Sequence, residues 1–470
     1  MNSSKGSNIH ISTEYMELDE DRGPRRSVLE EFEKKRRARQ IPVTVDDIEV
    51  KTHLREVGEP ICLFGEGPAD RRERLRQILA KLGQFTIKKA KEEEKAELEK
   101  DRDPNTTWYH EGPESLREAR YWIANYSLKR AKQRIDRAKG YKALPEAVKT
   151  ANRQELYNKL RSFEINASQI GDRRPVSCCQ FSPDCTMIAT GSWSGLCKLW
   201  NKETLNPIKI LSGHQGSVCG MVFHPESTLT QSRSALNLAS CGDGGAVNLW
   251  SLESEEPIGS LEGHEPHRVS RLAFHPSGRF LATACFDKSW RLWDLEANEE
   301  VLYQEGHSKE VYDVAFHPDG SLAATAGLDD FGRVWDLRTG HCIMFMEGHI
   351  KEVLSIAFSL NGYQVATGSE DNCVKIWNLR QRSCEYTIPA HTNNVSKVVF
   401  DKVNGNFLVT SSYDNTVKVW TYPTWTQIHT LSGHDNKVMC ADISSDNQCI
   451  VSSSYDRTFK LWTSSKEGLS

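Results

Sequence analysis

The sequence lacks the features of an exported or membrane-bound protein. None of its 470 residues lies in a run of about 18 apolar residues, the length that a membrane-spanning helix needs. The first residues, Met1 to Gly6, are polar and contain no apolar stretch of the kind that a secretory signal has. We therefore expect a soluble protein that is neither exported nor inserted into a membrane.

Signatures of metal sites and catalysis are also missing. The 13 cysteines are scattered, odd in number and free of any Cys-x-x-Cys pair. We expect reduced thiols that pack as small apolar side chains, in place of disulfides or a zinc site. The sequence has no Gly-x-x-x-x-Gly-Lys-Ser/Thr loop, no Gly-x-Ser-x-Gly elbow and no His-Glu-x-x-His pair. These absences predict a non-enzymatic protein without a metal, a cofactor or a small-molecule substrate.

Tryptophan, in contrast, recurs with a regular period. Seven of the 12 tryptophans follow one another at intervals of 50, 43, 42, 42, 43 and 42 residues: Trp200, Trp250, Trp293, Trp335, Trp377, Trp420 and Trp462. A repeat of this length is typical of the four-stranded blades of a β-propeller. The spacing therefore predicts one ring of seven blades.

The repeats share polar residues at fixed offsets. A Gly-His or Ala-His pair precedes six of the tryptophans, Ser or Thr stands ten residues before each Trp, and in five units Asp stands six residues before it. This pattern resembles the WD-repeat family, in which these four side chains form a chain of hydrogen bonds. Because each buried polar atom then has a partner, we interpret them as structural and not as acid–base pairs. The predicted tetrads are His264–Thr283–Asp287–Trp293, His307–Thr325–Asp329–Trp335, His349–Thr367–Asp371–Trp377, His391–Thr410–Asp414–Trp420 and His434–Ser452–Asp456–Trp462.

The first two blades depart from the pattern. The first has Ser194 in place of Asp and no Gly-His pair, so we expect it to lack the full network. The second contains a longer, Ser-rich segment at 226–237, which is either a plain surface loop or a binding element. The last blade lacks a fourth strand after Trp462. We expect residues 160–167 to supply that strand and close the ring.

Charge divides the chain into two parts. Residues 1–160 carry 34 basic and 29 acidic side chains, and residues 161–470 carry 26 and 35. A segment so dense in charge buries little surface by itself. We therefore predict an all-β, seven-bladed WD-repeat β-propeller over 160–465, preceded by a mainly α-helical, partly disordered N-terminal region. Its expected parts are a disordered stretch at 1–26, a basic helix at 27–40, a motif segment at 41–82, a charged linker at 83–113 and a basic helical segment at 114–159.

The segment at 41–82 contains a long, specific string. Gly-Glu-Pro-Ile-Cys-Leu-Phe-Gly-Glu at 58–66 is followed by Asp-Arg-Arg-Glu-Arg-Leu at 70–75. The string resembles the splicing factor motif found in a few pre-mRNA-processing proteins, and the alternative is a small helical hairpin without a particular function. The motif residues that we single out are Pro60, Leu63, Phe64, Arg71, Arg72 and Arg74.

The segment at 114–159 combines positive charge with aromatic residues. From Leu116 to Lys142 it has nine basic and two acidic side chains. Such a surface suits RNA, because cations neutralise phosphates and aromatic rings stack on unpaired bases. Alternatively, the aromatics pack on the propeller or a partner and the charges are solvated, and both arrangements can hold on opposite faces. The candidates are Arg117, Arg120, Trp122, Tyr126, Lys129, Arg130, Lys132, Arg134, Arg137 and Lys139.

Together, these motifs resemble a family of WD-repeat splicing proteins of the U4/U6 small nuclear ribonucleoprotein (snRNP). The resemblance implies a scaffold in the nucleus, at nuclear speckles, that acts in the U4/U6·U5 tri-snRNP. Its implied partners are pre-mRNA-processing factor 3, cyclophilin H, other tri-snRNP proteins and U4/U6 snRNA. The competing hypothesis is a substrate receptor of a cullin-type ubiquitin ligase, because Trp335-Asp336-Leu337-Arg338 matches the Trp-Asp-x-Arg tetrapeptide of such receptors.

Overall fold

The computed structural model describes residues 36, 41, 43–44, 46–63, 66–82 and 113–464. The chain forms two compact units, Met1–His110 and Glu111–Ser470. The predicted disordered stretch at 1–26, nearly all of the basic helix at 27–40 and nearly all of the linker at 83–113 lie outside the described residues. Among the described helices, none is both long enough and apolar enough to cross a membrane.

The first unit contains a pair of helices. Helix α2 spans Asp47–Glu56 and helix α3 spans Pro68–Leu82. Val50 and Leu54 of α2 pack against Leu75 of α3, and all three side chains are almost completely buried. This small apolar contact holds the two helices together.

Two further helices precede the ring in the second unit. Helix α5 spans Glu114–Ala143 and helix α6 spans Glu146–Arg161. Between them, Leu144 has an extended backbone, which is the conformation that the residue before a proline prefers. The Leu144-Pro145 step therefore separates one continuous helical sequence into two helices.

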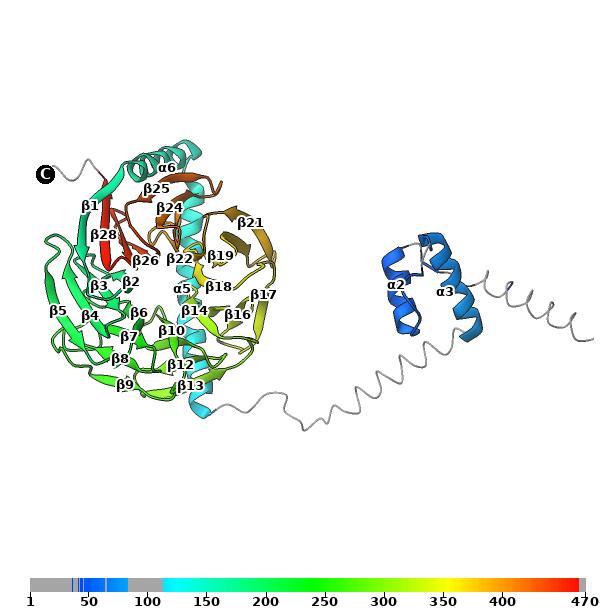
Figure 1. Ribbon diagram of the computed structural model, residues 1–470, viewed down its shortest axis with the longest axis horizontal. Coiled ribbons are helices and arrows are strands. Elements are labelled where there is room, and N and C mark those ends of the chain that lie inside the picture. Colours follow the sequence, from blue (N-terminus) through cyan, green and yellow to red (C-terminus); the bar gives the residue numbers. More distant parts are fainter. Residues whose placement is uncertain are drawn as a thin grey trace, which may run out of the picture. The chain divides into compact units, whose positions relative to one another are not determined.

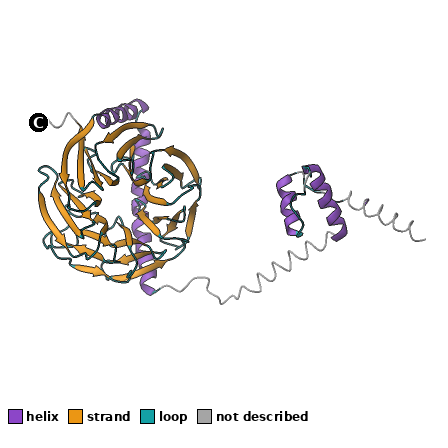
Figure 2. Cartoon of the chain, in the orientation of Figure 1, coloured by secondary structure: helices purple, strands orange, loops and turns teal. Residues whose placement is uncertain are grey.

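Seven four-stranded antiparallel sheets form a ring (Figures 1 and 2), which confirms the predicted seven-bladed propeller. The innermost strands are β2 (Val176–Phe181), β6 (Val218–Phe223), β10 (Val269–Phe274), β14 (Val311–Phe316), β18 (Val353–Phe358), β22 (Val395–Phe400) and β26 (Val438–Ile443). The second strands are β3 (Met187–Ser192), β7 (Leu238–Gly242), β11 (Phe280–Cys285), β15 (Leu322–Gly327), β19 (Gln364–Ser369), β23 (Phe407–Ser412) and β27 (Cys449–Ser454).

The two remaining positions complete each sheet. The third strands, which carry the repeated tryptophans, are β4 (Leu196–Asn201), β8 (Val247–Trp250), β12 (Trp290–Asp294), β16 (Gly332–Asp336), β20 (Cys373–Asn378), β24 (Thr416–Thr421) and β28 (Thr458–Ser464). The outer strands are β5 (Pro207–Ser212), β9 (Gly259–Leu261), β13 (Glu299–Gln304), β17 (Cys342–Met346), β21 (Ser383–Pro389), β25 (Gln427–Ser432) and β1 (Phe163–Ile170).

Burial follows position in the sheet. Every residue of the second strand β11 is buried, whereas the outer strand β21 exposes all of its residues except Ile388. The apolar side chains therefore concentrate between neighbouring sheets, where each tryptophan of the repeat is almost fully buried. Short strands of small, β-branched and aromatic residues are enough to build the core, because each sheet face is covered by the next sheet.

The outer strand of the last sheet comes from the beginning of the propeller sequence. Strand β1 pairs antiparallel with β28, from Phe163 opposite Ser464 to Ile170 opposite Thr458. The expected segment was 160–167, but helix α6 continues through Arg161, so the strand begins three residues later. The pairing joins the two ends of the ring and satisfies an edge that would otherwise be open.

Candidate interaction surfaces

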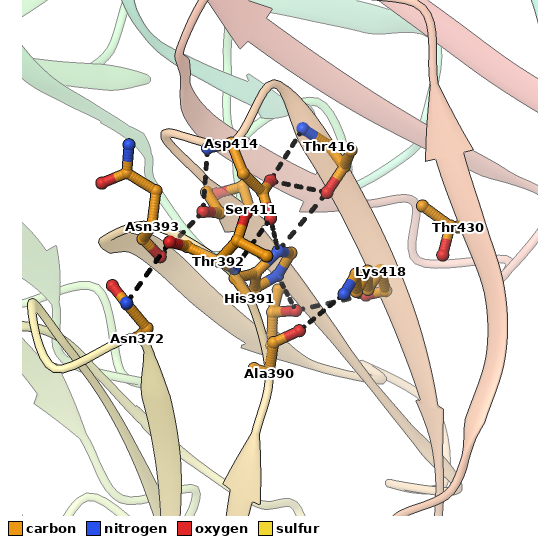
Figure 3. Close-up of polar contacts among 12 residues, drawn as sticks. Asn372, Ala390, His391, Thr392, Asn393, Ser411, Asp414, Thr416, Lys418 and Thr430 are labelled. Atoms are coloured by element: carbon orange, nitrogen blue, oxygen red, sulfur yellow. Dashed lines mark hydrogen bonds and ion pairs between the residues drawn. The ribbon is translucent and has the colours of Figure 1, made fainter.

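Four of the predicted tetrads form complete hydrogen-bonded chains. In the sheet of β22–β25, His391 Nδ1 lies 2.8 Å from Asp414 Oδ2 and His391 Nε2 lies 2.8 Å from Thr410 Oγ1. The indole N–H of Trp420 donates to the same hydroxyl at 3.0 Å. Figure 3 shows His391 in contact with Asp414, and Lys418 reaching the carbonyl oxygen of Ala390. The tetrads that contain His307, His349 and His434 have the same connections.

The carboxylates of these tetrads are held in their charged form. Burial raises the pKa of Asp414, but hydrogen bonds from His391 and Thr416 outweigh it and lower that pKa well below its usual value. Asp456 behaves in the same way, with His434 and Thr458 as its donors. Their partners are fixed inside the blade, so these residues stabilise the fold and leave no group free for acid–base chemistry.

The tetrad predicted around His264 is incomplete. His264 Nε2 lies 3.2 Å from Thr283 Oγ1, but His264 Nδ1 is buried without a hydrogen-bond partner. Asp287 instead accepts from Arg291 Nη2 at 2.9 Å and from the hydroxyl of Ser289 at 2.5 Å. The prediction of a full tetrad is therefore wrong for this blade, because the guanidinium of Arg291 takes the carboxylate that His264 would need.

The first two blades use other arrangements. In the first, the indole of Trp200 donates to Thr190 at 2.8 Å, and Asp172 replaces the histidine by bonding Ser194 and Lys198. In the second blade, His214 Nε2 lies 2.6 Å from Ser240 Oγ, which also accepts from Trp250 at 2.7 Å. No carboxylate contacts His214 among the hydrogen bonds of the described chain. The Trp–Ser/Thr contact is thus present in every blade, whereas the His–Asp contact is not.

Helix α5 packs on one face of the ring. It contacts the loops that join the innermost to the second strand in consecutive sheets, at 275–279, 317–321 and 359–363. At its N-terminal end, Leu116, Ala119 and Ile123 are buried in one apolar cluster. The cluster also contains side chains of β11, β12 and β16, and Leu337, which directly follows β16. Burying a leucine or isoleucine side chain contributes about 1.5 to 3 kcal/mol to the stability of the folded state. The first three turns of α5 are therefore an integral part of the propeller core.

The two aromatic candidates of α5 face the propeller. Trp122 stacks on Tyr126 with 5.2 Å between ring centroids, and it meets Phe280 edge-on at 5.6 Å. Both rings pack on His275, and the guanidinium of Arg279 lies 5.3 Å from the Trp122 centroid. The ring faces are covered by the propeller and by each other. Of the two alternatives for Trp122 and Tyr126, the structure therefore shows packing on the propeller and not a free stacking surface for unpaired bases.

Arginines fasten the middle of α5. Arg134 Nε and Nη2 both donate to the carboxylate of Asp319, at 2.9 and 2.8 Å, and Nη1 donates to the carbonyl oxygen of Asn361 at 2.7 Å. Asp319 is nearly buried, with 5% of its side chain exposed, so the pair is largely removed from water. Arg130 donates to the carbonyl oxygen of Pro318 at 3.2 Å. Arg120 lies against Gly340, where a Cβ atom would come within 2.3 Å of the guanidinium, so the glycine permits this close approach. These arginines fix the helix in place.

The remaining cations of α5 point to solvent. Their side chains are exposed, and apart from Lys139, which lies 3.5 Å from Asp136, they form no ion pair with another described residue. Most of them lie on the helix face opposite to Ile123 and Arg134, as the helical period of 3.6 residues requires. The exposed cations are Arg117, Lys129, Lys132, Lys139, Lys142 and Arg137, of which Arg137 lies on the same side of the helix as Arg134. The basic sequence thus divides into a docked face and a positively charged solvent face.

In the first unit, the motif arginines form a local ion-pair network. Arg74 Nε and Nη2 hold the two oxygens of Glu66 at 2.6 and 2.9 Å, and Arg71 Nη1 lies 2.5 Å from Asp47. The hydrogen bond from Arg74 lowers the pKa of Glu66. Arg72 donates to the carbonyl oxygen of Pro68 at 3.3 Å. Arg71 and Arg74 therefore join α2, the intervening loop and α3.

The two described apolar residues that we single out in the motif loop are exposed. Leu63 is 50% exposed and does not pack on α3, because Val50 and Leu54 of α2 occupy that apolar surface. Pro60 is exposed as well, and Phe64 lies outside the described residues. Pro60 and Leu63 are thus both exposed on the loop between the helices.

The tetrapeptide that suggested a ligase receptor has a structural role in its own turn. Arg338 Nε and Nη2 donate to the two oxygens of Asp336, both at 3.0 Å. Trp335 belongs to a complete tetrad. Every charged group of this tetrapeptide is therefore paired within the blade.

The main functional residues that the sequence did not reveal are those that receive α5. His275 and His317 begin the loops under the helix, and their Nε2 atoms lie 2.9 and 3.1 Å from the carbonyl oxygens of Gly320 and Gly362. Burial lowers the pKa of His275 to about 4. The signal was present as a repeated His-Pro pair, at 224–225, 275–276 and 317–318. Nothing in the sequence indicated that a helix covers it.

Comparison with known proteins gives two family matches. The model for the WD domain, G-beta repeat, matches seven segments of the propeller, at 164–201, 205–251, 255–294, 299–336, 340–378, 382–421 and 425–463. The model described as pre-mRNA processing factor 4 (PRP4) like matches residues 50–78, which include most of α2 and α3.

Curated relatives carry related names. The chain is 57% identical over 283 residues to the U4/U6 small nuclear ribonucleoprotein Prp4 of Bos taurus, which covers 60% of this chain and 54% of the relative. It is 34% identical over 274 residues to the U4/U6 small nuclear ribonucleoprotein PRP4 of Saccharomyces cerevisiae, with 56% of each chain covered. A PRP4-like protein of Arabidopsis thaliana is 41% identical over 223 residues, 45% of this chain and 40% of that one. The chain spans about half the length of the curated relatives it matches.

Proposed function

Because the chain belongs to the WD-domain, G-beta repeat family and also carries a segment like pre-mRNA processing factor 4, we propose that it is a non-enzymatic scaffold of the U4/U6 snRNP. The observation that carries this proposal is the combination of the helix pair α2–α3 with the seven repeats. Seven blades alone support only a general interaction role, since the fold serves many functions. The relatives from cattle and yeast share the name U4/U6 small nuclear ribonucleoprotein Prp4, which supports the same proposed role.

The proposal includes the partners and the location of the protein. It acts in the nucleus, in U4/U6 and U4/U6·U5 particles and at nuclear speckles. Its partners are pre-mRNA-processing factor 3, cyclophilin H, other tri-snRNP proteins and U4/U6 snRNA. The exposed loop with Pro60 and Leu63 offers a small apolar contact for a protein, and the solvent face of α5 offers positive charge for RNA.

The charge on α5 supports a phosphate-binding role for its solvent face. Lys129 and Lys132 project away from the propeller and have no ion-pair partner among the described residues. Arg134, in contrast, is held by Asp319 and fixes the orientation of the helix. A rigid helix that presents unpaired cations is a suitable surface for the backbone of a structured RNA, because it needs no further ordering when it binds.

The test uses the full chain with K129E and K132E combined. We expect affinity for U4/U6 snRNA at moderate salt to fall at least tenfold and the slope of log K against log salt to become less steep by about 1 to 2. The matched control is K309E with K351E, which makes the same charge change in the loops on the opposite face of the ring. Thermal unfolding of both variants verifies the fold. RNA binding that is equal in the two variants would exclude a phosphate role for α5.

The scaffold itself is tested by affinity purification from nuclear extract. Recovery of U4 and U6 snRNA together with pre-mRNA-processing factor 3 is the expected result. Recovery of a cullin adaptor without snRNP components would instead favour the ligase receptor. That outcome is the less expected one, because Arg338 of the receptor-like tetrapeptide is already bonded to Asp336.

A further inference from the structure

The centre of the ring contains a cavity with an unbalanced positive charge. Its volume is about 380 Å³, and the innermost strands of all seven sheets line it. Three cationic side chains contribute to the lining: Arg271, Lys397 and Lys402. Each of these charges needs a neutralising partner, because burying an unpaired charge is costly.

Two of the cations have carboxylate partners. Lys397 Nζ lies 2.7 Å from Asp313 Oδ2, and Lys402 Nζ lies 2.7 Å from Asp442 Oδ1. Asp313 also accepts hydrogen bonds from Ser355 Oγ and from backbone N–H groups, so both of its oxygens are used. Both carboxylates are therefore already bonded to another cation.

Arg271 has no partner of its own. It is 9% exposed, and its guanidinium forms no hydrogen bond and no ion pair with any described residue. The carboxylate of Asp313, third in the neighbouring strand β14, acts on it by charge alone, without a hydrogen bond. It stands third in strand β10, where the pairing with β11 shifts between Val269 and Arg271. A shift of this kind re-aims a side chain, here toward the cavity. On the neighbouring strand β6 the same position is Gly220, which has no side chain to cover or pair with the guanidinium.

We propose that the central cavity is a binding site for a small phosphate-class oxyanion, with Arg271 as its main ligand. The planar guanidinium can bind two oxygens of such an anion through parallel N–H donors, which is the strongest geometry available to arginine. Inorganic phosphate and pyrophosphate both fit a cavity of this volume. The anion supplies the hydrogen-bond acceptors that the guanidinium of Arg271 lacks among the described residues, and it balances the one cation in excess of the carboxylates Asp313 and Asp442. This site is independent of the proposed role in the snRNP.

Cys440 is the internal competitor for this role. Its side chain lies in the same cavity, and a hydrogen bond with Cys179, together with the charges of Arg271 and Lys397, lowers the pKa of its thiol to about 6 against the effect of burial. A thiolate there would place a negative charge near Arg271 without any external ion. The C440S variant removes that charge and nearly preserves the volume, so it separates the two possibilities.

The experiment measures thermal unfolding of the full chain at constant ionic strength while sodium chloride is replaced by phosphate or pyrophosphate. Binding to the folded state alone raises the Tm continuously with ligand concentration. We expect such a rise for the wild type and for C440S, a larger rise with pyrophosphate, and little response to acetate, which carries a single charge. Calorimetric titration with phosphate gives the affinity. No phosphate-specific response of the wild type, or a response only in C440S, would overturn the proposal.

The variant R271M identifies the ligand residue. Without phosphate, R271M should unfold at a Tm equal to or above that of the wild type, because it removes an unpaired buried cation. With phosphate, only the wild type should gain stability, and the affinity of R271M should be at least tenfold lower. The matched control R174M removes an exposed arginine and should respond like the wild type. A loss of stability in R271M that does not depend on phosphate would assign Arg271 a purely structural role.

A conservative variant covers the case in which R271M does not fold. R271K keeps the positive charge but loses the planar pair of donors, so phosphate affinity should lie between those of the wild type and R271M. Phosphorus NMR of phosphate with the wild-type protein gives a second measurement, through line broadening that excess pyrophosphate reverses. An affinity of R271K equal to that of the wild type, or broadening that pyrophosphate leaves unchanged, would contradict the site.

Discussion

The four sheets with complete tetrads and the three without them are equally well formed, although they use different polar contacts. Four sheets have complete tetrads: β14–β17, β18–β21, β22–β25, and β26–β28 with β1. In each of them, a histidine bridges an aspartate and a strand hydroxyl. In the three earlier sheets, the indole–hydroxyl contact remains while the aspartate is absent or bonded elsewhere. The comparison teaches that a blade keeps the contact between indole and hydroxyl but does not require the His–Asp contact, and that one blade tolerates the unpaired Nδ1 of His264.

The irregular sheets are also where the molecule adds contacts. The sheet of β10–β13, whose tetrad is broken, receives the apolar end of α5 through Phe280 and contributes Arg271 to the central cavity. The regular sheet of β26–β28 instead receives β1, which continues the repeat geometry. A blade that departs from the repeat pattern can therefore be the one that carries an individual role in this protein.

The largest expected effect is on a complete tetrad. D414A removes the acceptor of His391 Nδ1 and of the Thr416 hydroxyl, and leaves buried donors unpaired. We expect the free energy of unfolding to fall by roughly 1 to 3 kcal/mol. Denaturant unfolding of the full chain, followed by tryptophan fluorescence, measures it. The matched change in an incomplete blade is D287A, which breaks no hydrogen bond to a histidine and should cost less. Equal losses for the two variants would show that the His–Asp contact adds nothing.

A smaller effect is expected when the stability difference between the wild type and D414A is measured at acidic pH. Because the folded-state pKa of Asp414 lies below the usual 3.8, its contribution to stability is fully present above about pH 4 and is lost as the pH falls through the folded value. The stability difference between the wild type and D414A should therefore shrink below pH 4 and stay constant between pH 5 and 7. Urea unfolding at several pH values measures this difference. A difference that persists unchanged at the lowest pH at which both proteins fold would refute the charged hydrogen bond.

The accuracy of the sequence analysis follows the same division. The seven blades follow from spacing, and the four complete tetrads are those that the resemblance to the WD-repeat family implies, because a fixed offset within a rigid repeat places the same atoms together each time. The predicted tetrad around His264 is incomplete, and two local differences accompany it. Arg291 binds Asp287, and the loop has one extra residue, because His264 stands five positions before Val269 whereas His307 stands four before Val311. The position of α5 was not predictable either. A helical stripe shows which side is buried, but Asp319 and Phe280, which bury it, lie far away in the sequence.

The smallest expected effect tests why the His264 tetrad is broken. In the complete blade of Figure 3, Lys418 occupies the position of Arg291 and donates to the carbonyl oxygen of Ala390 at 2.8 Å, which leaves Asp414 to His391. Arg291 donates to the equivalent carbonyl oxygen of Gly263 at 2.6 Å, but its second nitrogen also holds Asp287.

R291K should release that carboxylate toward His264. Burial and the charge of Arg291 lower the pKa of His264 to about 4, so a newly bonded Asp287 should raise this pKa measurably in NMR titration. The stability should change by no more than about 0.5 kcal/mol, because one set of hydrogen bonds replaces another. The control R333K changes the same position in a blade whose tetrad is already complete, and the His307 resonances should stay unchanged. If the His264 pKa also stays unchanged in R291K, then the extra loop residue, and not the arginine, keeps the tetrad open.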